Sequence, residues 1–343
     1  MLELLKKLCE INGASGDEDH VAEFIIANIS TEGAVIRRDN LGNVLVFKKG
    51  RKTPSKLVMF AAHMDEVGFI ITGIDSNGYL RFGTVGGIMS SAVFGRKIKF
   101  KNGVTGVIAG KPVHMLTQKE KDTQPKIDDL LIDIGASSKS ESETYVNLGD
   151  YAYFENTYSE TPIGDTKAIT AKAIDNRLGC AIMLSMLKSV PEYDCVFAFT
   201  VQEEIGCRGA AVATFNLEPE ICIALEATTA CDTAGVSGEN KVCELDKGPV
   251  ISYMDKGTAY DRGLYNIATT VAKENDIQIQ TKTKIVGGND ASVIHKSAGG
   301  VRTLAISAPC RYIHTPHCRA YKNTLFNMQT LSEKLLISFS EID

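Results

Sequence analysis

The feature that most constrains the fold is a series of short, almost entirely apolar runs separated by segments of helical periodicity. The runs at 57–62 (L-V-M-F-A-A), 195–201 (C-V-F-A-F-T-V) and 221–225 (I-C-I-A-L) lack the polar alternation of a half-exposed strand. Strands of this composition are covered on both faces. With the helical segments between them, they predict an α/β fold, a mixed sheet with helices on both faces. Further strands are expected at 43–47 and 301–307, and helices at 176–188, 260–275 and 323–339.

A segment near the middle of the chain has a different texture. Asn77-Gly78 and Asn102-Gly103 each stand between two β-rich runs, which is a strong hairpin signal. Residues 130–134 add another short strand, and the polar stretch 119–126 is expected to be a loop. The stretch 69–163 is therefore predicted to be an all-β region.

The simplest organisation is one α/β domain formed by residues 1–68 and 164–343, with 69–163 inserted into it as a β-rich domain. The length of 343 residues is compatible with two domains.

Charge and cysteine content exclude several classes of protein. Lys and Arg number 37 and Asp and Glu number 42, a net charge of −5, which argues against a nucleic-acid partner held through its phosphates. No stretch reaches the roughly 18 apolar residues of a membrane helix, so no membrane partner is expected. The first ten residues predict an amphipathic helix and not a signal peptide. The nine cysteines form no C-x-x-C pair, as expected of reduced thiols in a cytoplasmic protein.

Polar residues follow several of the apolar runs, where an open α/β sheet binds its ligands. His63 and Asp65 come directly after the run at 57–62, and Asp65 can orient the second ring nitrogen of a metal-binding His63. Glu203 and Glu204 end the next run, and packing alone does not explain two adjacent acids there. Glu226 ends a third run. A surface loop or a capped strand end is the alternative reading for each group.

Two further positions complete the set. Asp175 stands at a helix start and, taken alone, is best explained as an N-cap. His314 follows the strand at 301–307, where Cys310, His317 and Cys318 lack a second cluster that would complete a structural zinc site. Asp232 competes with Glu226 for the same role. The remaining histidines, His20, His114 and His295, are expected at the surface or in the core.

Together, two histidines and three carboxylates stand beside a spare glutamate. Five ligands with one shared carboxylate can make two sites of three protein ligands each, which leaves positions open for water. Imidazole and carboxylate ligands suit Zn²⁺, Co²⁺ or Mn²⁺. The chemistry that this predicts is hydrolysis of an amide, ester or phosphate.

Six ordered motifs are similar to those of a known family. They are A-H-M-D-E-V-G, A-I-D-N-R-L-G, Q-E-E-I-G-C-R-G-A, A-L-E-A-T-T-A-C-D, G-G-N-D-A and Y-I-H-T-P. In this order they resemble the glutamyl/deblocking aminopeptidases, dinuclear metallopeptidases that form tetrahedral (TET) particles and include members labelled endoglucanase or cellulase M. The resemblance extends from about residue 4 to 336.

The resemblance implies a role for each residue, by motif position. His63 and Glu226 would bind one metal and Glu204 and His314 the other, with Asp175 bridging them. Two divalent ions per subunit are implied, with zinc the first candidate and cobalt or manganese as alternatives.

The two remaining site residues would serve the reaction. Glu203 would be the general base and acid for a metal-bridging hydroxide, and Asp65 would hold His63. A cis peptide is expected after Asp175.

The resemblance also has consequences beyond the site. The β-rich insertion would be a PDZ-like or barrel-like dimerisation domain, and the particle a dodecamer with an uncharged stretch at 83–95 between subunits. Two departures stand out, because many relatives have Asp at position 226 and most have Thr at 289, where this chain has Glu226 and Asn289.

The sequence therefore predicts an aminopeptidase that acts on peptides with a free N-terminus. A related metal-dependent deacylase or carboxypeptidase shares the same chemistry. A glycosidase is disfavoured, because its two carboxyls must flank one bond about 5–9.5 Å apart. A non-catalytic scaffold is disfavoured because candidates occupy every catalytic position.

Overall fold

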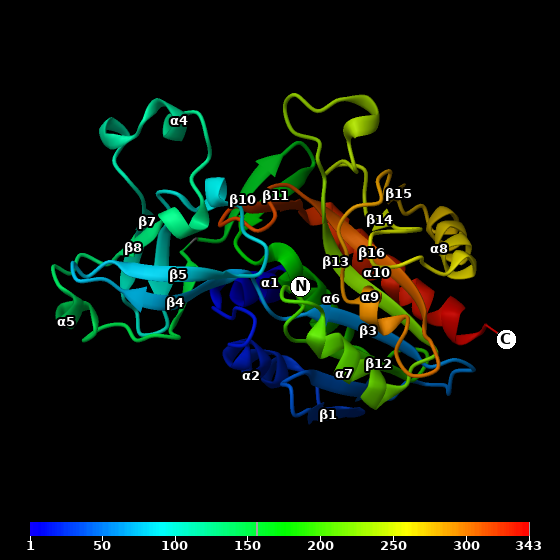
Figure 1. Ribbon diagram of the computed structural model, residues 1–343. Coiled ribbons are helices and arrows are strands. Elements are labelled where there is room, and N and C mark those ends of the chain that lie inside the picture. Colours follow the sequence, from blue (N-terminus) through cyan, green and yellow to red (C-terminus); the bar gives the residue numbers. More distant parts are fainter. Residues whose placement is uncertain (156, 343) are drawn as a thin grey trace.

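The computed structural model describes residues 1–155 and 157–342 and contains a larger α/β part beside a smaller barrel (Figure 1). The larger part is built on an eight-stranded sheet in the order β1-β2-β12-β3-β13-β16-β14-β15. The strands are β1 (Ala34–Arg38), β2 (Val44–Lys48), β3 (Val58–His63), β12 (Cys195–Thr200), β13 (Ile221–Thr229), β14 (Val250–Ile251), β15 (Gln280–Thr281) and β16 (Arg302–Cys310). The four central strands β12, β3, β13 and β16 are parallel, whereas β2 and β14 run antiparallel to their central neighbours. The predicted mixed sheet is confirmed.

Helices cover both faces of this sheet, as the apolar runs predicted. Alternate residues of β3 point to opposite faces. Val58, Phe60 and Ala62 pack in the main core, whereas Met59 and Ala61 pack against the other helix layer. One layer consists of α1 (Leu2–Glu10), α2 (Asp19–Asn28), α6 (Ile174–Met186), α8 (Arg262–Glu274) and α10 (Lys322–Ser340), and the other of α7 (Arg208–Leu217) and α9 (Ala291–Ile294).

The smaller part is a closed barrel in the order β4-β5-β8-β7-β6-β9. Its strands are β4 (Gly68–Ile74), β5 (Leu80–Val85), β6 (Lys97–Phe100), β7 (Thr105–Ala109), β8 (Leu131–Asp133) and β9 (Tyr151–Phe154). Both hairpins expected at Asn-Gly dipeptides are present, and Gly78 and Gly103 each have a φ of 91°. Such values are accessible to glycine without strain. Apolar side chains fill the interior, which gives the barrel its own core.

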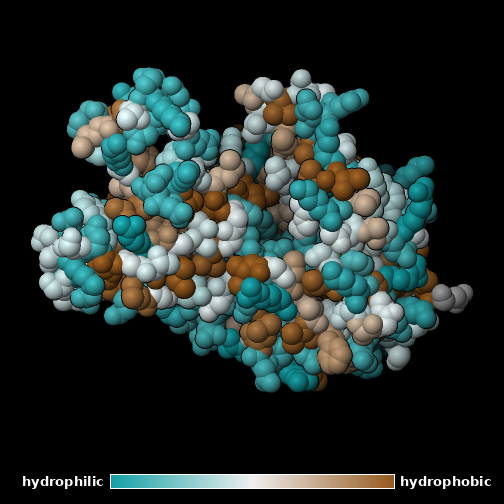
Figure 2. Space-filling view, viewed as in Figure 1, coloured by the Kyte–Doolittle hydropathy of each residue, from teal (hydrophilic) through white to brown (hydrophobic). Residues whose placement is uncertain are grey.

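Three short helices interrupt the barrel region: α3 (Ser90–Val93), α4 (Gln118–Lys121) and α5 (Lys139–Ser142). The expectation of a plain loop at 119–126 is therefore wrong in its first part. Thr117 and Glu120 form a reciprocal capping box that stabilises α4. Figure 2 shows a mostly hydrophilic surface where the segment around α4 projects from the barrel. Single 3₁₀ turns lie at Val113–Met115, Ile127–Asp129 and Gly238–Asn240.

A third sheet is separate from both the eight-stranded sheet and the barrel. It consists of β10 (Ser159–Ile163), β11 (Thr166–Ala171) and β17 (Cys318–Tyr321), all antiparallel. The barrel strands thus end at Phe154, and β10 pairs with β11 outside the barrel. The division into 1–68 with 164–343 and 69–163 stays a prediction. In the described parts of the chain, no helix combines the length and the apolar character that a bilayer crossing requires.

Candidate metal centre

The central strands bring their carboxyl ends to one edge of the sheet, and the predicted site residues gather there. His63 is the last residue of β3, and Glu203 and Glu204 follow β12. Glu226 lies on β13, and His314 follows β16. Parallel neighbours end at the same edge, so sequence positions far apart meet in one place.

His63 is buried, and its two ring nitrogens have different surroundings. Nδ1 lies 3.2 Å from the Asp65 carbonyl oxygen and 3.4 Å from its Oδ1. Both are acceptors, so a proton on Nδ1 would satisfy them, and Nε2 is then the nitrogen that would bind a cation. Nε2 lies 3.3 Å from Asp175 Oδ1 and 3.8 Å from Glu226 Oε2. This arrangement leaves Nε2 available to a cation.

Asp175 lies between two imidazoles. Its Oδ1 faces His63, and its Oδ2 lies 3.6 Å from His314 Nε2. The helix-cap interpretation of Asp175 is wrong, because α6 is capped at Ala173 and no side chain makes a cap hydrogen bond there. The peptide bond between Asp175 and Asn176 is cis, as the resemblance implied. One carboxylate therefore faces two potential cation positions.

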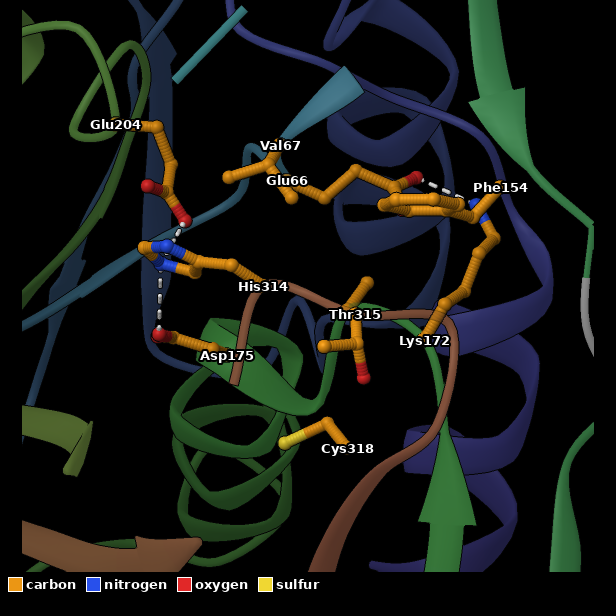
Figure 3. Close-up of a pocket in the computed structure, with 10 residues that line it drawn as sticks. Glu66, Val67, Phe154, Lys172, Asp175, Glu204, His314, Thr315 and Cys318 are labelled. Atoms are coloured by element: carbon orange, nitrogen blue, oxygen red, sulfur yellow. Dashed lines mark hydrogen bonds and ion pairs between the residues drawn. The ribbon is translucent and has the colours of Figure 1, made fainter. Parts of the chain in front are cut away.

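His314 completes the second position (Figure 3). Its Nε2 lies 3.1 Å from Glu204 Oε1, and its Nδ1 lies 2.7 Å from the Gly87 carbonyl oxygen. Figure 3 shows the ring between Glu204 and Asp175, with an interaction to each. Across the same pocket, Lys172 pairs with Glu66 at 2.5 Å, and both side chains are buried.

The expectation that Glu226 ends its strand is wrong. Glu226 lies inside β13, which continues to Thr229. Its Oε2 accepts a hydrogen bond from Asn176 Nδ2 at 3.0 Å. Its Oε1 is buried and has no hydrogen-bond partner in the described residues. The competing Asp232 is paired with Arg311 at 2.6 Å, so Glu226 is the acid that faces His63.

Asp65 also holds the turn that carries the two adjacent glutamates, a role that the sequence did not reveal. Its carboxylate accepts hydrogen bonds from the backbone N–H groups of Glu203 and Glu204, both at 3.1 Å. Ser15 Oγ donates to it at 2.6 Å. Gln202 begins this turn with a φ of 58°. The turn directs the Glu203 carboxylate to 3.9 Å from His63 Nε2.

The site crowds carboxylates together in a buried environment. Burial raises the pKa of Glu203 to about 8, and burial also raises the pKa of Glu226 well above its ordinary value. Burial alone would lower the pKa of His314, but Asp175 and Glu204 beside it raise this pKa to about 11. Buried carboxylates and a histidine held charged by acidic neighbours are both features that bound divalent cations would stabilise.

The donor set fits a pair of cations. One group consists of His63, Asp175 and Glu226, and the other of Asp175, Glu204 and His314; within each, one donor atom per residue lies within 4.8 Å of the others. The two groups share Asp175. Nitrogen and oxygen donors without thiolate suit Zn²⁺, Co²⁺ or Mn²⁺. The buried Glu226 Oε1 has no hydrogen-bond partner among the described residues, and a bound cation would supply one.

Other predicted candidates lie elsewhere. His20 and His114 are exposed, and His295 Nδ1 lies 2.7 Å from the Ala291 carbonyl oxygen. Among the described residues, His317 and Cys318 belong to no group with metal-binding geometry. Sequence reasoning missed one neighbouring group, Glu203 with Cys207 and Asp290, because no strand-end rule selects these last two residues.

The Asn289 departure has a visible structural effect. Its Nδ2 donates to Tyr260 Oη at 3.0 Å, and its Oδ1 accepts from the Ala291 N–H at 2.8 Å. Tyr260 in turn donates to Asp255 at 2.5 Å. A threonine could not make the same amide bridge. Asn289 thus connects the loop before α9 to this buried pair.

Comparisons with known proteins agree with one another. The model of the M42 glutamyl aminopeptidase family matches residues 42–331. The lysyl aminopeptidase of Pyrococcus furiosus is 33% identical over 352 residues, covering 99% of this chain and 98% of that protein. A TET aminopeptidase from a Thaumarchaeota archaeon of marine sediment superposes with a TM-score of 0.91 at 30% identity, covering 97% and 95%. The Pyrococcus horikoshii TET1 peptidase, described as assembling into a tetrahedron or a large octahedral shell, gives 0.83 at 33% identity, covering 97% and 98%.

Proposed function

The chain belongs to the M42 glutamyl aminopeptidase family, and from this premise we propose that it is a dinuclear aminopeptidase that removes the N-terminal residue of peptides. The observation that carries the proposal is Asp175, whose two oxygens face His63 at 3.3 Å and His314 at 3.6 Å. A carboxylate shared by two ligand groups is what a pair of nearby catalytic ions requires.

The ligands of the two ions would be divided along the lines of the geometry. His63 and Glu226 would hold one ion, Glu204 and His314 the other, and Asp175 both. When bound, such ions supply an activated water and polarise the scissile carbonyl. Zinc is our first candidate, with cobalt or manganese as alternatives, because the donor set accepts each of them.

Glu203 would be the general base and acid. Its carboxylate lies 3.9 Å from His63 Nε2 and is grouped with His63 and Glu204, but it belongs to neither of the two groups that share Asp175. It would take a proton from the attacking water and return it to the leaving amine. Asp65 supports this role because its carboxylate contacts both residues. It lies beside Nδ1 of His63 and accepts a hydrogen bond from the backbone N–H of Glu203.

We also propose a cytoplasmic homo-oligomer, with a dodecamer as the expectation. The assembly of the Pyrococcus horikoshii relative supports this. So do exposed apolar side chains in the uncharged stretch at 83–95, where Met89 is 66% exposed and Phe94 49%. All nine cysteines are unpaired thiols, which suits a reducing compartment.

The test is a panel of aminoacyl-p-nitroanilides, each with its N-acetylated twin. Every reaction is run with native protein, after chelation, and after addition of Zn²⁺, Co²⁺ or Mn²⁺. We expect metal-dependent cleavage of the free-amine substrates only, because a site for the α-amine would reject the acetylated form. Cleavage of the acetylated twins would support a deacylase instead, and activity that survives chelation would contradict the metal mechanism.

A further inference from the structure

A third potential cation position lies beside Glu203, on the side of its carboxylate that faces Cys207. Glu203, Cys207 and Asp290 each place one donor atom within 4.8 Å of the other two. The two oxygens of Glu203 face different ways: Oε2 faces His63, whereas Oε1 lies 3.7 Å from Cys207 Sγ. Glu203 is therefore shared between the metal centre and this second group of donors.

Asp290 provides independent evidence for a missing ligand. The residue is completely buried. Its Oδ2 accepts a hydrogen bond from Thr200 Oγ1 at 2.5 Å, but its Oδ1 has no hydrogen-bond partner in the described residues. A buried carboxylate oxygen without a partner is unfavourable, and a cation would remove that deficit.

The thiol is placed to join such a site. Cys207 Sγ donates to Glu203 Oε1 and accepts a hydrogen bond from Ser292 Oγ at 3.7 Å. Cys207 is 8% exposed and the Glu203 side chain is 13% exposed, so both donors are mostly shielded from water but not completely enclosed. One sulfur with two carboxylates favours a softer ion than the nitrogen and oxygen donors of the proposed catalytic positions.

We propose that Glu203, Cys207 and Asp290 form an inhibitory site for a soft divalent cation such as Cd²⁺. On binding, the S–H bond of Cys207 breaks, its proton passes to the solvent, and a sulfur–metal bond forms; nothing is oxidised or reduced. The Glu203 carboxylate becomes a ligand and is removed from proton transfer. This last consequence rests on the proposed function, whereas the binding itself does not.

The probe is Cd²⁺, added to the full-length protein that retains its own ions. A thiolate bound to Cd²⁺ gives an ultraviolet charge-transfer band, which the thiol-free catalytic ligands cannot produce. Bound cadmium is counted by metal analysis, and peptidase activity is followed in parallel. The variants are Cys207→Ala, Asp290→Asn and, as the matched control, Cys231→Ala, which removes a partly exposed thiol outside the group.

We expect one thiolate-bound Cd²⁺ per chain in the wild type and in Cys231→Ala, with a loss of activity that parallels the band. Cys207→Ala should lose the band and the matching phase of inhibition. Asp290→Asn keeps the thiol and should bind about tenfold or more weakly. No band in the wild type, or a band that persists in Cys207→Ala, would overturn the proposal. The band can be measured even in a protein without peptidase activity. The test of this cation site is therefore independent of the test of the proposed aminopeptidase function.

Discussion

The Nδ1 atom of His314 lies 2.7 Å from the carbonyl oxygen of Gly87, although 227 positions separate the two residues in the chain. A carbonyl oxygen can only accept, so the proton is on Nδ1 and Nε2 points at Asp175 and Glu204. Gly87 follows the barrel strand β5. The barrel therefore orients a proposed metal ligand of the α/β part, as the outer partners of metal-binding histidines do.

Gly86→Ala should reduce activity by displacing this contact. Gly86 has a φ of 84°, and an added Cβ would lie 3.1 Å from Glu204 Cβ and 2.9 Å from Val67. We expect kcat/KM and metal affinity to fall about 10–100-fold. The matched control is Gly95→Ala, whose φ is 73° but whose Cβ would meet nothing within 4 Å. Both variants should lose about 1–2 kcal/mol of stability through backbone strain. Equal activity in the two variants would contradict the proposed coupling.

Glu203→Gln should separate the proton-transfer role from metal binding. The amide cannot accept the proton of the attacking water, so kcat should fall about 10²–10⁴-fold. Both ions should stay bound, because Glu203 belongs to neither of the groups that share Asp175. Metal analysis and steady-state kinetics on the same preparation measure the two effects. The exposed Glu23→Gln serves as the control, and loss of metal together with activity would assign Glu203 to the ligands instead.

The parallel sheet explains why so much of the site could be predicted. Apolar runs identify strands that are covered on both faces, and parallel strands bring their carboxyl ends together. This logic brings His63, Glu204 and His314 into one place, and the structure has them there. It requires only that the strands be recognised and that the metal-binding residue types within a few positions of their ends be considered together.

What could not be predicted depends on loops. Ser15 reaches Asp65 across 50 positions, and no local pattern indicates that contact. The turn that exposes Glu203 to Cys207 relies on positive φ at Gln202 and Cys207, two residue types that rarely adopt it. The exit from β13 was also misjudged, since a polar residue such as Glu226 can continue a strand when its side chain faces a site.

Lys172→Met should destabilise the protein strongly. Lys172 pairs with Glu66 at 2.5 Å in the interior, and Arg177, at 3.8 Å, is the other cation near that carboxylate in the described chain. Removing one partner of a buried pair costs about 3–5 kcal/mol. Lys167→Met is the control, because its pair with Glu160 has the similar length of 2.7 Å but lies at the surface. There the loss should be about 0–1 kcal/mol. Urea unfolding curves of both variants measure the difference, and similar midpoints would refute it.

Glu18→Gln should change how stability depends on pH. Burial, with a smaller contribution from Asp65, raises the pKa of Glu18 to about 7, and Gln202 N–H donates to its Oε1 at 3.0 Å. In the unfolded chain a glutamate has a pKa of about 4.3. Between these values the folded state binds a proton that the unfolded state does not. Stability contributed by Glu18 is therefore complete below about pH 4.3 and is lost as the pH rises through about 7.

Glutamine imitates the protonated form and keeps the acceptor for Gln202. Relative to the wild type, the free energy of unfolding of the variant should therefore increase between pH 5 and pH 8, by on the order of 2–3 kcal/mol across that range. Thermal unfolding of the metal-loaded proteins at several pH values measures this gain as a Tm difference that widens with pH. Glu10→Gln, at the exposed end of α1, should follow the wild type throughout. A Glu18→Gln curve that stays parallel to the wild type would show that Glu18 is ionised in the folded protein over the whole range.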